Sequence, residues 1–390
     1  MAKLNVGIVG TGFIARTHVD AFRRACFLFP ETETEVAIHI VADAELAQAE
    51  RFAKSCGAAL ATADWHSVVD DPQIQLVDIS APNHLHFPIA MAAIEAGKAV
   101  YCEKPLALSH DQARQMSEAA TQGGVQTFVA FNNLFAPSTQ LAKILIDDGA
   151  IGRPVQFIGS FDQGFYSDPA LPHSWRVTEA EAGSGALGDL GSHIISIAQH
   201  LVGPVSSVMA QDAVVFADRP VAVTGSGYGA RSSSQAERRP VENDDFFEAL
   251  VRFETGALGS IGASRVAPGK VFGINWEVRG TEGALRVDDE RPSELQIFRM
   301  ADAPHDRGFK TVLAGSQVEG FREGFLGFDY GGGGIGYFDV KVLEIRAMLL
   351  ALVGKAENRF DFEFGRQNQA IVDAIRESAR TAGTRLNPAV

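Results

Sequence analysis

The stretch from Leu4 to Ala15 reads LNVGIVGTGFIA and decides the fold of the first part of the chain. Its apolar first half predicts a buried strand, and the G-x-G-x-x-A pattern after it leads into an amphipathic helix. Gly10 permits a tight turn, and Gly12 lets the backbone approach a pyrophosphate. Ala15 allows close packing of helix on strand, while the helix N-terminus supplies partial positive charge. The pattern predicts a dinucleotide-binding domain; the alternative is an ordinary strand-to-helix turn that requires small residues.

Length, charge and cysteine content limit the class of protein. A chain of 390 residues is too long for one ordinary domain and predicts two. A formal net charge of −14 argues against binding to nucleic acid or to an anionic membrane surface. No apolar run is long enough to cross a bilayer, and the first residues indicate a strand and not a signal peptide. Three cysteines without paired spacing favour a reduced, cytoplasmic setting and not a zinc site.

The second predicted strand, residues 36–42, ends at Asp43. A carboxylate in this place accepts hydrogen bonds from both hydroxyls of an adenosine ribose and repels a 2′-phosphate, which favours NAD over NADP. Asp43 follows Gly10 by 33 residues (43 − 10), against about 20 in the usual fingerprint, and we attribute the excess to an insertion around residues 27–32. Because residues 45–56 have the pattern of a helix, a helix-capping role is the alternative for Asp43.

Lys104 follows another predicted strand within the sequence Glu-Lys-Pro. In an open parallel sheet, ligands bind just past the carboxyl ends of the strands. A lysine there is a compact cation whose pKa falls readily when it is desolvated, although a solvated loop lysine is the alternative. Three strands with helices between them complete one doubly wound domain over residues 1–132; they are 76–80, 98–102 and 126–131.

The loop after residues 76–80 reads APNHLH over residues 81–86. It belongs to the same carboxyl edge of the predicted sheet. Asn83 has the position of a helix N-cap. His84 and His86 allow two interpretations, as surface residues near a helix start or as part of a site at that edge.

The second part of the chain, residues 133–390, has a different pattern. Strand-like runs follow one another with few helices between them, which predicts an α+β domain with a large, open and mostly antiparallel sheet. These runs are 155–161, 205–216, 246–253, 257–266, 272–280, 284–287 and 295–299. Helices are predicted over residues 186–202, 338–352 and 367–382, a mobile polar insertion over 225–240 and a flexible glycine run over 331–334.

Four motifs occur in an order that is similar to one known family. They are the glycine-rich stretch at 10–15, Pro-Asn-His-Leu-His at 82–86, Glu-Lys-Pro at 103–105 and GSGALGDLGSH at 183–193. With this order the chain resembles the Gfo/Idh/MocA family of NAD(P)-dependent oxidoreductases over nearly its whole length. Residues 167–169, 174–176 and 334–337 are similar to sugar dehydrogenases of the levoglucosan dehydrogenase type, which oxidise a hydroxyl of a pyranose ring.

The resemblance implies a Rossmann domain and a second domain for substrate binding and oligomerisation. It also implies that a secondary hydroxyl is oxidised with NAD as cofactor and that Lys104, Asp189 and His193 are catalytic. No metal is expected. The residues expected along cofactor or substrate, glycine motif included, are Gly10, Gly12, Phe13, Ile14, Asp43, Ser80, Asn83, His86, Glu103, Lys104, Asn132, Trp175, Arg176 and Tyr337.

Two places depart from the family pattern, and both affect the expected sugar pocket. Ser196 stands where many members carry a second acid. Asn133 and Leu134 stand where many carry an aromatic or basic pair. These departures leave the identity of the substrate open, but they do not affect the expected type of reaction.

The implied chemistry gives each catalytic residue a role. His193 has an ordinary pKa near the working pH and suits removal of the hydroxyl proton. Lys104 would hydrogen-bond the same oxygen and stabilise the charge that develops on it. Asp189, four residues before His193 on one helix face, would orient the sugar or the histidine. The alternatives are an inositol or cyclitol dehydrogenase and a non-catalytic NAD-binding sensor of sugars.

The second domain also predicts an assembly. Its sheet has helices for only part of its area, and residues 213–216 are apolar on both alternations. A bare sheet face would be an exposed apolar patch, which soluble monomers avoid. We therefore expect a homodimer or homotetramer, with a small sugar or cyclitol as the other partner.

Overall fold

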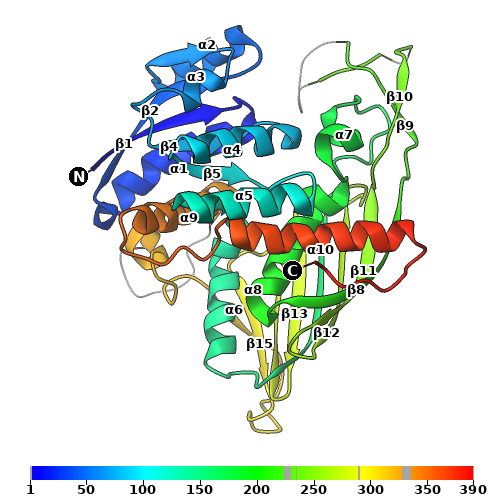
Figure 1. Ribbon diagram of the computed structural model, residues 1–390. Helices are drawn as coiled ribbons and strands as arrows, with labels where there is room; N and C mark the ends of the chain where they lie inside the picture. Colours follow the sequence, from blue (N-terminus) through cyan, green and yellow to red (C-terminus); the bar gives the residue numbers. More distant parts are fainter. Residues whose placement is uncertain (1, 224–229, 234, 289, 327–334, 390) are drawn as a thin grey trace. The chain divides into compact units, whose positions relative to one another are not determined.

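The computed structural model describes residues 2–223, 230–233, 235–288, 290–326 and 335–389 (Figure 1). The chain divides into two compact units. Unit 1 consists of Met1–Phe135, Glu319–Gly327 and Gly336–Gln367, and unit 2 of Ala136–Val318, Phe328–Ile335 and Asn368–Val390. Within the described ranges, no helix combines the length and the apolar character needed to cross a bilayer.

Unit 1 is built on a parallel sheet with the strand order β3-β2-β1-β4-β5-β6. The order runs outward from β1 in one direction and from β4 in the other, and sheets of this kind bind ligands where the order reverses. The predicted doubly wound domain is confirmed. The strands are β1 (Ala2–Val9), β2 (Thr34–Ala42), β3 (Leu60–Thr62), β4 (Leu76–Ile79), β5 (Ala99–Glu103) and β6 (Thr127–Ala130).

Helices connect these strands. Residues 27–32, where the sequence predicts an insertion, hold the last residues of the first helix and a short 3-10 turn before β2. The helices are α1 (Phe13–Leu28), α2 (Leu46–Cys56), α3 (His66–Val69), α4 (His86–Glu95) and α5 (His110–Gly123), and the 3-10 turns are η1 (Pro30–Thr32), η2 (Asn83–Leu85) and η3 (Asn132–Phe135).

One helix of unit 1 comes from far along the chain. α9 (Tyr337–Leu352) packs against α1 and η3, and the short π-helix η7 (Arg322–Leu326) belongs to the same unit. Arg24 of α1 lies 2.5 Å from Asp339 of α9. The structure thus differs from the predicted division, which assigned all of residues 133–390 to the second domain. The apolar pattern of this helix requires burial but does not indicate which sheet the helix covers.

Unit 2 is built on a sheet with the order β16-β15-β14-β13-β7-β12-β11-β8. Among the described strands of this sheet, β7 and β12 pair in parallel and the other neighbours are antiparallel, which confirms the predicted sheet type. The sequence did not predict β16, a short edge strand. The strands are β7 (Pro154–Asp162), β8 (Val205–Ala213), β11 (Phe246–Phe253), β12 (Leu258–Ser264), β13 (Gly273–Gly280), β14 (Gly283–Asp288), β15 (Glu294–Arg299) and β16 (Lys310–Leu313).

A separate two-stranded ribbon pairs β9 (Asp218–Pro220) with β10 (Arg238–Pro240). The sequence predicted a mobile insertion over residues 225–240, and the structure differs at its end, because β10 forms backbone pairs with β9. Residues 224–229 and 234 of that stretch lie outside the described residues, as does the predicted glycine run 331–334.

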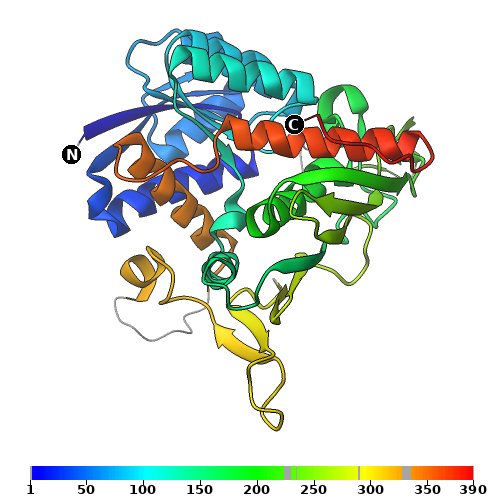
Figure 2. The same cartoon turned by 60° about the horizontal axis from the view of Figure 1, so that its bottom comes forward.

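The two faces of the large sheet have different surroundings. α6 (Pro137–Asp147) and α8 (Ser192–Val202) lie side by side against one face (Figures 1 and 2), where alternate residues of β11 such as Phe247 and Val251 are buried. On the opposite face, Leu250 pairs with Met209, and both are exposed. Asn368, in the second turn of α10 (Phe362–Arg380), donates to the Ser192 carbonyl oxygen of α8 at 3.1 Å, and α7 (Glu179–Ala182) precedes α8 in the chain.

The turn before α8 places its backbone against Asp244. The amides of Gly185 and Leu187 donate to the two carboxylate oxygens of Asp244, each at 2.7 Å. The amide of Ala186 donates to the Asp244 carbonyl oxygen at 2.9 Å. A Cβ atom at Gly185 would lie 1.8 Å from that carbonyl oxygen, so only glycine fits here unless the backbone moves.

Gly185→Ala should therefore lower the free energy of unfolding by roughly 1–3 kcal/mol, as overpacking does. Gly308→Ala is the matched control, because a Cβ atom at Gly308 has no heavy atom within 4 Å. Urea denaturation of both variants measures the difference. Equal stability of the two variants would contradict the close approach at Gly185.

Candidate functional site

The glycine-rich loop joins β1 to α1. Gly10 has a φ of +97°, and a Cβ atom there would lie 2.5 Å from the carbonyl oxygen of Ser80. Gly12 has the opposite surroundings, since its Cβ position has no described heavy atom within 4 Å. α1 starts at Phe13, and no side chain among the described residues caps its first amide groups. This loop fits the pyrophosphate of a dinucleotide.

Asp43 ties this loop to the end of β2. Its Oδ2 atom accepts hydrogen bonds from the amide and the hydroxyl of Thr11, at 3.2 and 2.5 Å. Its Oδ1 atom accepts from the amide of Glu45, which is itself the N-cap of α2. A carboxylate has about four acceptor positions, so Asp43 retains capacity for a ribose hydroxyl beside these contacts.

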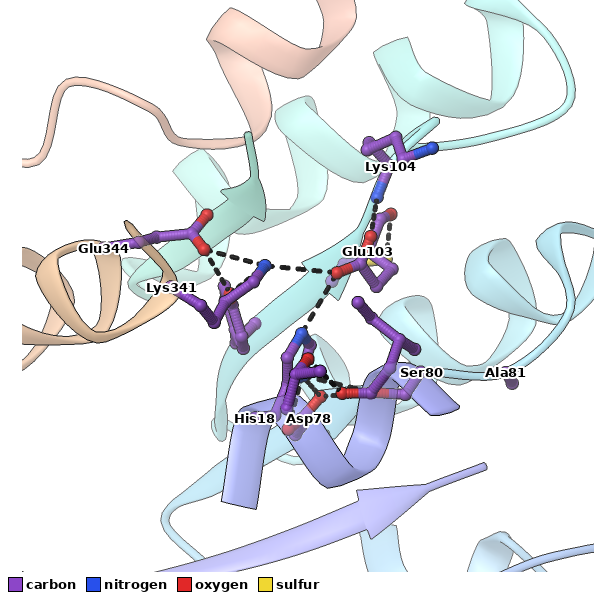
Figure 3. A network of polar contacts seen from close by, with 12 residues as sticks. His18, Asp78, Ser80, Ala81, Glu103, Lys104, Lys341 and Glu344 are labelled. Carbon is purple, nitrogen blue, oxygen red and sulfur yellow. Dashed lines mark hydrogen bonds and ion pairs between the residues drawn. The ribbon is translucent and has the colours of Figure 1, made fainter. Parts of the chain in front are cut away.

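A network of buried polar groups connects four elements of unit 1 (Figure 3). His18 of α1 lies between two carboxylates: its Nδ1 atom is 2.9 Å from Asp78 of β4, and its Nε2 atom is 3.0 Å from Oε1 of Glu103 in β5. The hydroxyl of Ser80 donates to Asp78 at 2.9 Å. Lys341 of α9 donates to the same Oε1 atom of Glu103 at 3.3 Å. One carboxylate oxygen thus receives two cationic donors.

Lys341 extends the network into α9. Its ammonium lies 2.8 Å from Oε2 of Glu344 and donates to the hydroxyl of Tyr101 at 3.1 Å. The Tyr101 hydroxyl in turn donates to Glu344 at 2.9 Å. The side chain of Lys341 is 1% exposed and that of Glu344 is 4% exposed, so these charges are removed from water.

The charges of the network stabilise one another. Burial alone would lower the pKa of His18, but Asp78 and Glu103 raise it to about 9 against the opposing charge of Lys341. Burial alone would raise the pKa of Glu103, yet Lys341, His18 and Lys104 hold that pKa below its usual range. The pKa of Lys341 is raised, because the carboxylates around its ammonium outweigh its burial.

The segment that carries Lys104 is held from two directions. The Lys104 amide donates to Oε2 of Glu103 at 3.1 Å, and the peptide bond between Lys104 and Pro105 is cis. The ring of His86 lies between two carbonyl oxygens, that of Pro105 at 2.9 Å from Nδ1 and that of Ala81 at 3.0 Å from Nε2. The Glu103 carboxylate thus holds the backbone at Lys104, and the His86 ring lies against the backbone after it.

His86 is 1% exposed, so the interpretation of it as a surface residue is wrong. Burial lowers its pKa, although the carbonyl oxygens oppose this, and the neutral imidazole donates from one nitrogen. Asn83 begins η2 and Asn132 begins η3. The Nδ2 atom of Asn132 is buried without a hydrogen-bond partner among the described residues. A buried donor of this kind is suited to a ligand.

Tyr337 is the first residue of α9 and begins a small group of aromatic side chains. Its ring meets that of Phe338 edge to face at 6.0 Å, and Phe338 meets Phe13 of α1 at 6.1 Å. Phe13 is 55% exposed and Ile14 beside it is partly buried. The start of α9 and the start of α1 are therefore neighbours within unit 1.

Unit 2 holds the other two predicted catalytic residues. Asp189 lies in η5 (Leu187–Gly191), a π-helical turn, and His193 lies in the first turn of α8. His193 is 7% exposed, and its ring meets that of Phe161 edge to face at 5.7 Å. The buried hydroxyl of Ser196 donates to the His193 carbonyl oxygen at 2.7 Å. π-Helical turns occur frequently at functional sites.

Trp175 and Arg176 lie in the 3-10 turn η4 (Trp175–Val177) of the same unit. The Arg176 guanidinium lies 4.4 Å from the centre of the Trp175 ring. The carbonyl oxygen of Arg176 accepts hydrogen bonds from Asn243 at 3.0 Å and from Arg265 at 3.2 Å. The buried Arg265 also pairs with Asp245 at 2.9 Å, so the backbone of this turn is fixed to the core of unit 2.

The structure places the predicted residues in two sets, whose roles stay predictions. Unit 1 contains Gly10, Gly12, Phe13, Ile14, Asp43, Ser80, Asn83, His86, Glu103, Lys104, Asn132 and Tyr337. Unit 2 holds Trp175, Arg176, Asp189 and His193. Nowhere in the described part of the chain do His, Cys, Asp and Glu side chains form a group that could hold a metal ion.

The motifs in the sequence did not indicate the buried network of His18, Asp78, Lys341 and Glu344. One signal was present in the sequence. Asp78 interrupts an otherwise apolar strand, and a charge at a buried position requires a partner. The partners themselves come from α1 and α9, and neither spacing nor periodicity connects these helices with β4.

Two family models match the chain. A model described as the NAD-binding Rossmann fold of an oxidoreductase family matches residues 4–131, and the GFO/IDH/MocA C-terminal domain matches residues 139–286. The chain belongs to the Gfo/Idh/MocA family. The resemblance stated from the motifs is confirmed, and with it the assignment of this family member as an oxidoreductase with an NAD-binding Rossmann fold.

Several relatives of this Gfo/Idh/MocA protein are named as sugar or cyclitol dehydrogenases. Levoglucosan dehydrogenase from Pseudarthrobacter phenanthrenivorans is 38% identical over 380 residues, 97% of each chain. A solved levoglucosan dehydrogenase, in complex with NADH and levoglucosan, has a TM-score of 0.92 and 36% identity over 100% of both chains. A crystal structure of an NAD binding oxidoreductase from Klebsiella pneumoniae has a TM-score of 0.93 and 49% identity over 100% of both chains. The scyllo-inositol 2-dehydrogenase (NAD(+)) of Bacillus subtilis is 29% identical over 68% of this chain and 70% of its own.

The raised pKa of His18 predicts that the stability of this family member falls at alkaline pH. The pKa of the imidazole is 6.5 without the fold and about 9 within it. The stabilisation is complete below the lower value and is lost as the pH rises through the upper one, and its size is on the order of 3 kcal/mol. The groups that face the imidazole are Asp78, Glu103, Lys341 and Tyr101.

Urea denaturation of the wild type and of His18→Gln at a series of pH values tests this prediction. The difference between the two free energies of unfolding should be largest at about pH 6 and should shrink toward about pH 10. Titrating groups that do not interact with His18 are common to both proteins and cancel in the difference. A difference that stays constant with pH would contradict the raised pKa.

Proposed function

We propose that this protein is an NAD-dependent dehydrogenase that oxidises a secondary hydroxyl of a pyranose-type sugar, levoglucosan or a related glycoside, to a ketone. The observation that carries the proposal is the similarity to levoglucosan dehydrogenase, 38% identity that extends over 97% of the chain and so over both units. The position of Lys104 immediately after β5, on a backbone held by Glu103 and His86, supports it.

The proposed reaction divides between cofactor and protein. Bound NAD supplies the hydride acceptor. His193 takes the proton of the hydroxyl, for which an imidazole is suited at neutral pH. Lys104 donates a hydrogen bond to the same oxygen and stabilises the negative charge that develops on it. Asp189 orients the sugar or the imidazole from its position one turn before His193.

The fit of unit 1 to NAD rests on three features. Open space lies above Gly12, the amide groups at the start of α1 are uncapped by side chains among the described residues, and Nδ2 of Asn132 is a buried donor. A phosphate accepts from backbone amides at a helix N-terminus. These residues would hold the pyrophosphate and a further polar group of the cofactor.

An inositol or cyclitol dehydrogenase is the second candidate, favoured by the 29% identity to a scyllo-inositol dehydrogenase. The third, a sensor that binds NAD and sugar without turnover, accounts less well for the presence of both Lys104 and His193. A spectrophotometric screen for NADH formation with anhydrosugars, pyranosides and inositols separates the three. Turnover of levoglucosan or a pyranoside above that of every inositol supports the proposal. Preferred turnover of an inositol, or none with any compound, overturns it.

The cofactor preference provides a further prediction. Asp43 is half-buried and fixed by Thr11, so its negative charge stays beside the ribose position, and its neighbour Ala44 brings no positive charge for a 2′-phosphate. We expect a higher kcat/KM with NAD than with NADP. The double variant Asp43→Ser with Ala44→Arg should narrow the preference, measured as the ratio of the two kcat/KM values. A wild type that prefers NADP would refute this assignment.

The role of His193 is tested by the pH dependence of the rate. If the imidazole accepts the hydroxyl proton, kcat for oxidation should rise with pH over an ascending limb between mildly acidic and mildly alkaline pH. His193→Asn should lose about a hundredfold or more in kcat and should lack this limb, while NADH binding measured by fluorescence is retained. A limb that persists unchanged in the variant would assign the base to another group.

We further propose that the exposed face of the large sheet is the contact between two copies of the chain. Leu250 is 64% exposed on that face beside Met209, which is 44% exposed. Burial of such apolar surface favours association. Light scattering at micromolar concentration should give a dimer or tetramer, and Leu250→Glu should shift it toward the monomer. Val271→Glu is the control, because Val271 is 86% exposed outside the strands. A monomeric wild type would contradict the proposal.

A further inference from the structure

We propose that Lys341, on helix α9, is a positioning residue for Lys104, and that it acts by fixing the Glu103 carboxylate that holds the Lys104 backbone. Lys341 is separated from Glu103 by 238 residues of sequence, and both belong to unit 1. The role of Lys104 rests on the proposed function, but the geometry that connects it with Lys341 does not.

Buried acceptors surround the ammonium of Lys341. An ammonium has three donors, and three acceptors surround this one: Tyr101 at 3.1 Å, Glu103 at 3.3 Å and Glu344 at 2.8 Å. The side chain is 1% exposed, so water does not compete for these positions. Because all three N–H donors of the ammonium are used and water is excluded, the ammonium is held in one position. The position of α9, which carries Lys341, determines where that is.

The two oxygens of the Glu103 carboxylate have different partners (Figure 3). Its Oε1 atom receives Lys341 at 3.3 Å and His18 at 3.0 Å, and its Oε2 atom receives the amide of Lys104 at 3.1 Å. The two oxygens belong to one rigid planar group. Cations that fix Oε1 therefore fix the direction of Oε2, and with it the place of the Lys104 amide.

Contacts at its first turn hold α9 in place. Asp339 accepts a hydrogen bond from the Gly336 amide at 2.9 Å at the start of the helix and pairs with Arg24 of α1 at 2.5 Å. Tyr337 is one helical turn before Lys341, so both side chains project from the same helix face. One helix thus carries a residue predicted along the ligand and the cation that orders the Lys104 segment.

The buried ion pair of Glu103 and Lys341 is not explained by a gain in folding stability alone. Replacing a buried ion pair with apolar side chains of similar volume is often neutral or stabilising, because the desolvation of two charges offsets their attraction. Glu103 and Lys341 are desolvated all the same, and the Glu103 carboxylate that Lys341 contacts accepts the backbone amide of Lys104. The consequence specific to this arrangement is the order of the Lys104 segment.

Hydrogen exchange at the Lys104 amide tests the positioning without any substrate. In the wild type this amide donates to Glu103, and we expect that bond to protect it from exchange. Lys341→Met should raise its exchange rate by about tenfold or more, because Glu103 then loses one of the two cations that fix it. Lys341→Arg keeps the charge and should recover part of the protection. If Lys341→Met does not fold, as judged by thermal unfolding, Lys341→Gln replaces it as the uncharged variant.

Lys98→Met is the matched control for loss of a buried lysine in the same unit. Lys98 precedes the opposite end of β5, is 7% exposed, and donates to the carbonyl oxygens of Asp71 at 2.6 Å and Ile74 at 2.9 Å. This variant should lose stability without a change in exchange at the Lys104 amide. Unchanged exchange in the Lys341 variants, or an equal rise in Lys98→Met, would overturn the inference.

A double-mutant cycle tests whether the order of Lys104 matters for turnover. Lys341→Met should lower kcat by about tenfold and leave the Kd for NADH within about threefold, whereas in a Lys104→Met background it should have almost no further effect on kcat. Fully additive effects would mean that Lys341 acts on kcat by a route other than Lys104 and would overturn the kinetic part. If exchange is faster in Lys341→Met but the wild type turns over no substrate, the proposed dehydrogenase function is refuted and the positioning stands.

Discussion

The arrangement of unit 1 depends on one requirement: a carboxylate removed from water must be surrounded by donors and cations. Glu103 is 8% exposed, and its charge is retained because an imidazolium, an ammonium and a backbone amide meet its two oxygens. These partners come from α1, from α9 and from the residue after β5. The requirement therefore determines how a helix early in the chain and one late in it pack against the same strand.

Much of the fold follows from local pattern, and the residues show why. The run before Gly10 and the glycines after it specify a strand, a tight turn and a helix start over only twelve residues, so the sequence is sufficient for the prediction. The same is true of β11, where the period of two separates buried Phe247 from exposed Phe246. Lys104 was assigned to a strand end for the same reason, since an apolar run followed by Glu-Lys-Pro has one interpretation in an alternating α/β pattern.

What the sequence did not reveal depends on contacts between distant segments. α9 has apolar residues on most of its surface, so its pattern is the same whichever unit it joins. His86 was left open between surface and interior because a histidine at a helix start is compatible with both, and its two carbonyl partners are fixed only by the tertiary fold. Asp43 was assigned to a ribose, and its bonds to Thr11 became visible only when the loop and the end of β2 were placed together.

The late position of α9 has a consequence for synthesis of the chain. The strands of the parallel sheet are complete once the ribosome has made residue 130, but the ammonium that neutralises Glu103 belongs to residue 341. Until then the nascent sheet contains a carboxylate with an incomplete set of partners. The side of α1 that α9 contacts in the finished protein also remains uncovered. Contacts of such long sequence separation slow folding, because the loop between them must close first. The parallel sheet, whose strands are made first, thus reaches its final state only after α9 has been made.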